Sequence, residues 1–293
     1  MRGTRYLIVD VFCEERFKGN QLAVFLNAGS LEGETMQALA REMNFSESTF
    51  ILENQPSARG WPVRIFTPQA EVPFAGHPTL GTSWVIANEL LDEKPETLTL
   101  DLRAGAIPVR FASDSAGELI WMTQNSPEFQ GGLDAAVVAE VLGLEVTDID
   151  RRFPIEQVST GLPFLIVPVV SLDAMRRARL HGEAYDRICE LGHKAIFFFA
   201  AETVDASNNV HARMFADAFG VPEDPATGSA NGCLAAWLVR HRYFGDASID
   251  LTVEQGVEMG RASKLFLRAS EKDSTFSIQV GGRVIPVADG RLR

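Results

Sequence analysis

The 293-residue sequence contains only three cysteines and far fewer basic than acidic side chains. Cys13, Cys189 and Cys233 are widely spaced, and no CxxC or Cys/His spacing accompanies them, so neither a zinc site nor a disulfide framework is predicted. This pattern favours a reducing, cytoplasmic compartment. The net charge of −12 argues against nucleic acid or an anionic membrane surface as a partner, because phosphates attract the opposite charge. An anionic ligand would therefore need a local binding site.

Long apolar runs are also missing. The opening MRGTRYLIVDVF has too short an apolar run for a signal peptide, and PFLIVPVVSL from residue 163 is interrupted by Pro168. We therefore expect no targeting segment and no membrane span. The composition, 46% hydrophobic and 23% charged, is typical of a globular protein, and the length favours about two domains of roughly 150 residues.

Strand-like and helix-like segments alternate, and the second half repeats the order of the first. Runs of β-branched and aromatic residues predict strands, and apolar residues at helical spacing predict helices. In the first half, strands are predicted at 5–12, 19–26, 48–53, 62–67, 98–113 and 118–124, and helices at 32–43 and 78–91. In the second half, strands are predicted at 160–169, 194–202, 209–217, 248–256, 263–270 and 276–288, and helices at 171–180, 182–192 and 233–244.

Short motifs recur as well. RIFTPQAEVPFAGH (64–77) aligns with RMFADAFGVPEDPATGS (213–229) after a three-residue insertion, and LTLDLRAG (98–105) aligns with LTVEQG (251–256). The offsets agree closely, since Phe66 to Phe215 is 149 residues and Gly76 to Gly228 is 152. The sequence therefore predicts a duplication of one α+β unit in which strands wrap around a central helix.

Each repeat has a Gly-containing loop directly before its apolar helix, AGHP at 75–78 and ATGS at 226–229. The first turn of a helix exposes N–H groups and the positive end of the helix dipole, and both attract anions. Helix capping would explain either loop alone. Their presence in both halves favours a carboxylate site where the two helix starts converge on one cleft.

A few side chains near these loops can move protons. His77 adjoins the first loop, and Asp224 and Ser229 belong to the second. Glu47 begins a strand near Phe45 and Phe50, where partial burial would disfavour its charge and raise its pKa into a range useful for acid/base catalysis. The alternatives are a solvated strand-end charge for Glu47 and a helix cap for His77.

Four motifs resemble the PhzF-like family of phenazine biosynthesis isomerases, whose members have the diaminopimelate epimerase-like fold. The resemblance extends from VDVF (9–12) to the last predicted strand. The motifs are NFSESTFI (44–51), FTPQAEVPFAGHPTLG (66–81), EDPATGSANG (223–232) and EQGVEMGR (254–261).

The resemblance implies an α+β fold of two pseudo-symmetric lobes, each a barrel-like sheet around a central helix. We expect an N-terminal lobe of residues 1–125, to which a last strand at 280–293 is a candidate to return. The C-terminal lobe would comprise residues 126–279, with the active site in the cleft between the lobes. The family also implies a homodimer, a small anionic metabolite as substrate, and neither a metal nor an organic cofactor.

The family's site residues carry over position by position. The Glu of NFSE, here Glu47, is the catalytic acid/base, and His77 and Asp224 belong with it in the active site. The substrate would also be held by Gly76, Gly228 and Ser229. Asn20 falls in GNQLAV, where Gln21 replaces the proline of the family's GNPLAV pattern, and it is a further candidate for substrate binding.

Related racemases place a cysteine immediately before the glycine at each helix start, so that two thiols exchange the proton. The matching positions here are Ala75 and Thr227, which disfavours a two-thiol mechanism. Cys233 does not replace them, because it would lie one turn inside an apolar helix and is expected to be buried.

The duplication also breaks at Glu47, since Ile196 occupies the position 149 residues later. A single carboxylate without a symmetric partner favours isomerisation by a proton shift within one substrate. Two alternatives stay open. One is an epimerase or racemase that uses Glu47 with a second base such as Asp224, and the other is a non-catalytic small-molecule binding protein on the same fold.

Overall fold

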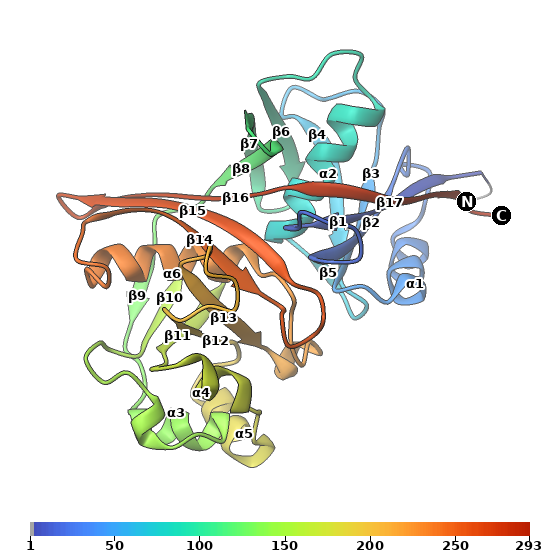
Figure 1. The fold of residues 1–293 in the computed structure, drawn as a ribbon. Helices are drawn as coiled ribbons and strands as arrows, with labels where there is room; N and C mark the ends of the chain where they lie inside the picture. The colour runs from blue at the N-terminus through green and yellow to red at the C-terminus, as the bar shows by residue number, and fades with distance from the viewer. Residues whose placement is uncertain (1–2) are drawn as a thin grey trace. The chain divides into compact units, whose positions relative to one another are not determined.

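The computed structural model describes residues 3–293, which form two compact units (Figure 1). The first unit comprises the described residues up to Thr123 together with Gly281–Arg293, and the second comprises Gln124–Val280. The last segment belongs to the first unit because β17 (Val284–Arg291) pairs antiparallel with β1 (Arg5–Val11). Within residues 3–293, no helix combines the length and apolar character needed to cross a membrane.

The first unit is a curved sheet around a buried helix, α2 (Gly76–Glu89). From β17 and β1 the hydrogen-bonded order continues through β2, β3, β4, β6, β7 and β8, with β5 paired to β4. Helix α2 contacts strands from both ends and the middle of this order, so the sheet surrounds it. The strands are β2 (Asn20–Phe25), β3 (Glu47–Ile51), β4 (Trp61–Phe66), β5 (Glu71–Val72), β6 (Thr97–Leu102), β7 (Gly105–Asp114) and β8 (Gly117–Thr123).

The second unit repeats this plan around α6 (Gly228–Arg240), which contacts β10, β11, β14 and β15. Its strands are β9 (Glu128–Gln130), β10 (Glu156–Ser159), β11 (Pro163–Pro168), β12 (Ile196–Ala200), β13 (Val210–Phe215), β14 (Ser248–Gln255), β15 (Ser263–Lys272) and β16 (Thr275–Gly282). Strand β16 runs from this unit into the first residues of the returning segment.

Other helices cover the outer face of each sheet. In the first unit, α1 (Gly33–Met43) buries Met36, Leu39 and Ala40 in a cluster that includes the stacked rings of Phe25 and Phe50. In the second unit, α3 (Ala135–Leu142), α4 (Leu172–Arg177) and α5 (Gly182–Glu190) cover the sheet in the same manner. Strand β12 is consequently buried on both faces, which explains its continuous apolar sequence IFFFA.

Strand directions follow the same order in both units. From β1 to β7, successive pairs are antiparallel, parallel, antiparallel, parallel and antiparallel. From β10 to β15 the order of directions is identical. The predicted duplication of one α+β unit is therefore confirmed at the level of topology, with β3 matching β12 and α2 matching α6.

The ladders refine the counterpart of Glu47. Phe66 pairs with Ser48 in the first unit, and its equivalent Phe215 pairs with Ile196 in the second. By this register Ile196 matches Ser48, and the counterpart of Glu47 is Ala195 rather than Ile196. Neither residue carries a carboxylate, so the asymmetry inferred from the sequence holds.

Several element boundaries differ from the predictions. Helix α6 begins at Gly228, five residues before the predicted start at 233, because burial of Ser229, Ala230 and Asn231 compensates for the weak helix propensity of this stretch. The predicted strand at 276–288 is two strands, β16 and β17. The sequence prediction also missed β9, α3 and β10, whereas the two helical segments at 171–180 and 182–192 correspond to α4 and α5.

Candidate active site

Glu47 is the first residue of β3 and pairs in parallel register with Leu22 of β2. The next four residues of the strand are buried, which fixes the backbone from which its side chain projects. The Glu47 side chain is 18% exposed. This largely buried position excludes the alternative of a freely solvated charge at a strand end, while leaving the carboxylate some access to solvent.

His77 is the second residue of α2 and the nearest imidazole to Glu47. Its Nδ1 lies 3.6 Å from Glu47 Oε2, and its side chain is 4% exposed. Burial lowers the pKa of His77 to about 3, although a hydrogen bond to the backbone of Gln21 acts in the opposite direction. The imidazole is therefore neutral near pH 7, and its contact with Glu47 is a polar contact rather than an ion pair.

A second contact holds β3 against α2 near these two residues. The Thr49 and Thr82 hydroxyl oxygens are 2.8 Å apart, and both side chains are buried. Thr49 is two residues beyond Glu47, and Thr82 is in the second turn after His77. This buried hydrogen bond therefore fixes the register between the strand and the helix that carry the pair.

Asn20 begins β2 and is 2% exposed, opposite Val11 of β1. The turn before it requires glycine, because Gly19 has φ +68° and a Cβ there would lie 2.3 Å from the Val11 carbonyl oxygen. Directly after this turn, the backbone of Gln21 makes a hydrogen bond with the His77 imidazole. Asn20 therefore belongs to the same part of the first unit as Glu47, and we call Asn20, Glu47, Gly76 and His77 the first half-site.

The start of α2 has no side-chain cap, since neither the N-cap residue Ala75 nor His77 fills that role. Thr79 N–H bonds the Ala75 carbonyl, Pro78 has no N–H, and the N–H groups of Gly76 and His77 precede the helical hydrogen-bond ladder. His77 Nε2 is buried and lacks a hydrogen-bond partner among residues 3–293. The helix start therefore offers buried N–H groups and an unpaired imidazole nitrogen to a ligand.

The second half-site consists of Asp224, Thr227, Gly228 and Ser229, all buried. Thr227 Oγ1 donates a 2.6 Å hydrogen bond to Asp224 Oδ2. Because this hydroxyl is directed at Asp224, the N-cap side chain does not cap α6. The helix start thus presents the N–H groups of Gly228 and Ser229 beside an oriented carboxylate.

Gln255, at the end of β14, organises this second half-site. Its Nε2 donates to the Asp224 carbonyl at 2.8 Å and to Thr227 Oγ1 at 3.1 Å. Its Oε1 accepts from Thr227 N–H at 3.2 Å and from Asn231 Nδ2 at 3.0 Å. Sequence reasoning missed Gln255 as a site residue, although it stands in the EQGVEMGR motif, because its role depends on contacts with a loop about thirty residues away.

Glu254, which precedes Gln255 in β14, belongs to a buried His–Glu cluster. His211 Nδ1 lies 2.7 Å from Glu254 Oε1, and His211 Nε2 lies 3.1 Å from Glu258 Oε1. Burial alone would lower the pKa of His211, but its two carboxylate partners raise it. Burial likewise opposes the ionisation of Glu254, yet His211 and the N–H groups of Val204 and Asp205 lower its pKa to about 2.

The cysteines do not take part in the half-sites. Cys233 is buried in α6, and burial raises the pKa of its thiol to about 12, as the sequence predicted for a structural position. With Ala75 and Thr227 at the two helix starts, neither half-site offers a thiolate. Among the described residues, no group of three or more His, Cys, Asp or Glu side chains is arranged to hold a metal ion.

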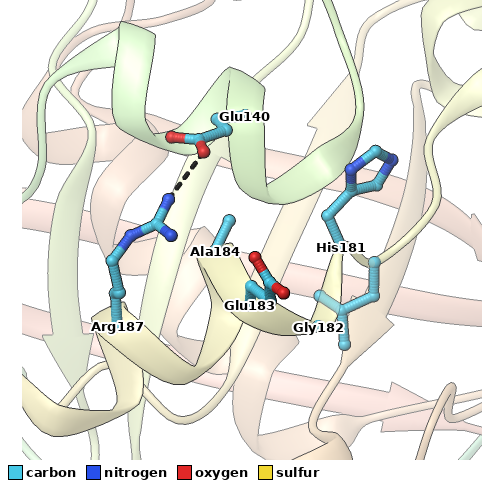
Figure 2. Close-up of a pocket in the computed structure, with 7 residues that line it drawn as sticks. Glu140, His181, Gly182, Glu183, Ala184 and Arg187 are labelled. Atoms are coloured by element: carbon cyan, nitrogen blue, oxygen red, sulfur yellow. Dashed lines mark hydrogen bonds and ion pairs between the residues drawn. The ribbon is translucent and has the colours of Figure 1, made fainter.

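A separate surface pocket of about 420 Å³ lies between α3 and the start of α5 (Figure 2). Glu140, His181, Glu183 and Arg187 contribute to its lining, and Arg187 Nη2 lies 2.6 Å from Glu140 Oε1. Both members of this ion pair are more than half exposed. The pocket contains none of the site residues predicted from the sequence, and its Arg187 and Glu140 are already paired with each other.

Comparison with known proteins agrees with the motifs. A family model described as "Phenazine biosynthesis-like protein" matches residues 9–290. The chain is 37% identical to trans-2,3-dihydro-3-hydroxyanthranilate isomerase from Pseudomonas aeruginosa, with 98% of each chain covered. It is 34% identical to an uncharacterised isomerase from Mesorhizobium japonicum, over 100% of this chain and 99% of that one.

Solved structures confirm the predicted fold. A PhzF family phenazine biosynthesis protein from Bacillus anthracis matches with a TM-score of 0.91, 29% identity and full coverage of both chains. A hydroxyproline epimerase from Agrobacterium vitis matches with a TM-score of 0.61 at 11% identity, covering 100% of this chain and 94% of that one. The second likeness concerns the fold alone and agrees with the predicted diaminopimelate epimerase-like architecture.

Proposed function

The chain belongs to the phenazine biosynthesis-like family of isomerases, and from this premise we propose that it shifts a proton within a small carboxylated, unsaturated or cyclic metabolite. The observation that carries the proposal is the first half-site. A largely buried carboxylate, Glu47, lies 3.6 Å from the neutral imidazole of His77, next to a helix start with no side-chain cap.

In the proposed reaction, the Glu47 carboxylate removes a proton from one carbon of the substrate and becomes a carboxylic acid. It then returns the proton to another carbon, so that the double bonds shift and the enzyme is regenerated. No redox change or added group is needed. The carboxylic acid formed in between is uncharged, so it suits the largely buried position of the Glu47 side chain.

His77 and Asp224 are proposed to orient the substrate and assist the transfer. In a neutral imidazole one ring nitrogen donates a hydrogen bond and the other accepts one, and His77 Nε2 has no partner among the described residues. The N–H groups at Gly76, Gly228 and Ser229 are proposed to bind the substrate's carboxylate, and Asn20 is a further candidate contact. Such local N–H donors would let a protein of net charge −12 bind an anion.

The first substrate to test is trans-2,3-dihydro-3-hydroxyanthranilate, which the relative from Pseudomonas aeruginosa is named for. It carries the carboxylate that the proposed N–H donors require and the unsaturated ring that a proton shift requires. A panel of other cyclic or unsaturated carboxylates belongs in the same experiment, because the half-sites favour a class of substrate rather than one molecule.

The decisive experiment compares the wild-type chain with Glu47→Gln in D2O, following turnover by absorbance and deuterium incorporation by NMR. We expect Glu47→Gln to lower kcat at least ~1,000-fold, because the amide cannot accept the proton, while the affinity for substrate stays within a few fold. Glu53→Gln is the matched control, since Glu53 follows the same strand but is exposed.

Other outcomes would reject parts of the proposal. Turnover retained in Glu47→Gln would remove Glu47 as the proton carrier. A product that differs from the substrate only in configuration would identify an epimerase or racemase that uses a second base. Ligand-induced stabilisation without conversion or deuterium uptake would identify a binding protein.

A further inference from the structure

Each unit contains an Arg–Glu ion pair with the same two-pronged geometry. In the first unit, Arg64 Nε and Nη2 donate to Glu71 Oε1 and Oε2 at 2.9 and 2.8 Å. In the second, Arg213 Nε and Nη2 donate to Glu223 Oε1 and Oε2 at 2.8 and 2.9 Å. We call these two pairs the forks. Such bidentate pairs are both stronger and more directional than single contacts.

The aromatic contacts of the forks are duplicated too. The Arg64 guanidinium lies 4.9 Å from the ring centroid of Phe66, and the Arg213 guanidinium lies 4.9 Å from that of Phe215. Each arginine is therefore held from one side by a ring two residues further along its own strand and from the other by a carboxylate. The guanidinium group of Arg64 also holds the pKa of Glu71 below its usual value.

The forks form although the connecting loops differ in length. Four residues separate Phe66 from Glu71, whereas seven separate Phe215 from Glu223, and the longer loop contains a short 3-10 turn at Asp217–Phe219. The longer loop nevertheless returns its glutamate to the equivalent arginine with the same geometry. Because the same Arg–Glu geometry occurs in loops of different length, it is not a by-product of one shared loop conformation. The position of the glutamate itself is therefore the feature that the two units have in common.

Both glutamates stand at the same distance from a helix start. Glu71 precedes Gly76 by five residues, and Glu223 precedes Gly228 by five. Backbone pairing supports the same placement, since Val72 pairs with Ile65 in the first unit and Asp224 N–H bonds the Met214 carbonyl in the second. Each fork therefore attaches the start of its loop to the sheet, and the other end of that loop is the first turn of α2 or α6.

We propose that the Arg64–Glu71 and Arg213–Glu223 forks are positioning elements for the two loops at residues 72–77 and 224–229. Each fork holds its loop in the position relative to the sheet at which the loop's N–H groups can bind a substrate carboxylate. The inference rests on the proposed function for the identity of the ligand. The four fork residues act through the loops and do not themselves contact substrate.

The two forks differ in how firmly they are held. Arg213 is 3% exposed, and its Nη1 also donates to the Met175 and Ala178 carbonyls at 2.7 and 3.1 Å. Arg64 is 31% exposed, and its glutamate has only Arg103, at 3.5 Å, as a further cationic neighbour among the described residues. The second loop is therefore fixed by a buried network, and the first by a solvent-accessible pair that screening weakens.

Hydrogen exchange of the free protein tests the positioning role without any substrate. Arg64→Lys keeps the positive charge but cannot make the two-pronged contact, and its matched control is Arg59→Lys, whose arginine pairs with Asp101 at 3.1 Å on the same sheet. We expect amides of residues 72–77 to exchange at least ~10-fold faster in Arg64→Lys than in the control, with amides of β1 and β2 unchanged.

The second unit is tested with Glu223→Gln, which keeps one hydrogen bond and avoids removing the buried arginine. Its control is Arg177→Lys, which alters an exposed pair with Asp148 and Asp173. The expected result is faster exchange at 224–229 only. If Glu223→Gln does not fold, Glu223→Asp provides the same comparison with the charge kept and the reach shortened.

Measurements of KM and Kd then test whether the loop position affects substrate binding. The probes are trans-2,3-dihydro-3-hydroxyanthranilate for kinetics and its stable aromatic counterpart, 3-hydroxyanthranilate, for binding. We expect Arg64→Lys to raise KM and Kd about 10-fold with kcat changed less than threefold, a smaller loss than the ~100-fold that a 1 Å misplacement of reacting groups can cause. Tm should fall by only a few degrees, as for Arg59→Lys.

The outcomes separate this inference from the proposed function. If the wild-type chain neither converts nor binds the probes, the proposed substrate class fails, and the exchange data alone decide the positioning role. Loop exchange equal to that of the controls would overturn the inference. Faster loop exchange with unchanged KM and Kd in an active enzyme would also overturn it, because the forks would then stabilise the loops without serving binding.

Discussion

The neutral state of His77 can be measured without knowing the substrate. Burial lowers its pKa from 6.5 to about 3, with the Gln21 backbone acting in the opposite direction. In the unfolded chain the same imidazole is solvated and titrates near its ordinary pKa of about 6.5. Between these two values, the unfolded state binds a proton that the folded state excludes.

The sign and size of the effect follow from this difference. Because the folded pKa is depressed, the stability associated with His77 is fully present above pH 6.5 and is lost progressively as the pH falls toward 3. Each pH unit within this window corresponds to about 1.4 kcal/mol for one proton. Between pH 6.5 and 4.5, His77 should therefore reduce the free energy of unfolding by up to about 3 kcal/mol, which is large against total stabilities of roughly 5–15 kcal/mol.

Urea unfolding at several pH values from 7.5 to 4.5 checks this prediction. His77→Gln removes the titration, so the free-energy difference between it and the wild-type chain should change by about 3 kcal/mol across the series. His181→Gln, which removes an exposed imidazole, controls for the loss of any histidine. NMR of labelled histidine in the folded protein should show a neutral His77 ring at pH 5.

Two results would refute the reasoning. A native His77 that titrates near pH 6.5 would mean that water or a proton reaches the ring freely, contrary to its 4% exposure. A constant free-energy difference between wild type and His77→Gln over the whole pH series would mean that the folded and unfolded pKa values are equal. In either case, the neutral imidazole assigned to the first half-site would have to be abandoned.

Two further predictions concern the supports of the second half-site. Gly256→Ala should cost more than about 2 kcal/mol of unfolding free energy in chemical denaturation, because Gly256 has φ +71° and a Cβ would lie 2.6 Å from the Pro225 carbonyl oxygen. Gly245→Ala, at φ +93° with nothing within 4 Å, isolates the backbone penalty, and equal losses would contradict the clash. The folded pKa of His211 is raised, so its contribution is fully present below about pH 6.5 and is lost as the pH rises through the folded value. His211→Gln should therefore cost up to roughly 3–5 kcal/mol at pH 6 and less at pH 9 in urea unfolding, and a cost that does not depend on pH would contradict the assignment of a cationic His211.

The sequence predicted those features that local patterns encode. Helix α1 was correct because Met36, Leu39 and Ala40 occur at helical spacing. The duplication was visible because the loop motifs recur with their glycines in place. The cytoplasmic location and the homodimer stay predictions.

Features that depend on distant contacts were not predictable in the same way. The strand predicted at 276–288 divides after Gly282, where a Cβ would lie 2.2 Å from the Phe12 ring, a neighbour far away in the chain. Helix α6 begins before its strong helix formers because its first residues are buried. Gln255 contacts a loop that only the folded sheet brings to it.

The two half-sites differ in the carboxylate that each contains. Glu47 has no carboxylate counterpart in the second unit, where the ladder places Ala195. Asp224 likewise has none in the first, since Val72 stands four residues before Gly76 as Asp224 does before Gly228. One Asp224 oxygen already accepts a hydrogen bond from the Thr227 hydroxyl at 2.6 Å. The duplicated scaffold therefore repeats the helix starts and the forks in both units, whereas its two carboxylates are unique and unequal. That inequality supports the proposal that Glu47 transfers the proton and Asp224 orients the substrate, and a symmetric two-base racemisation fits these residues less well.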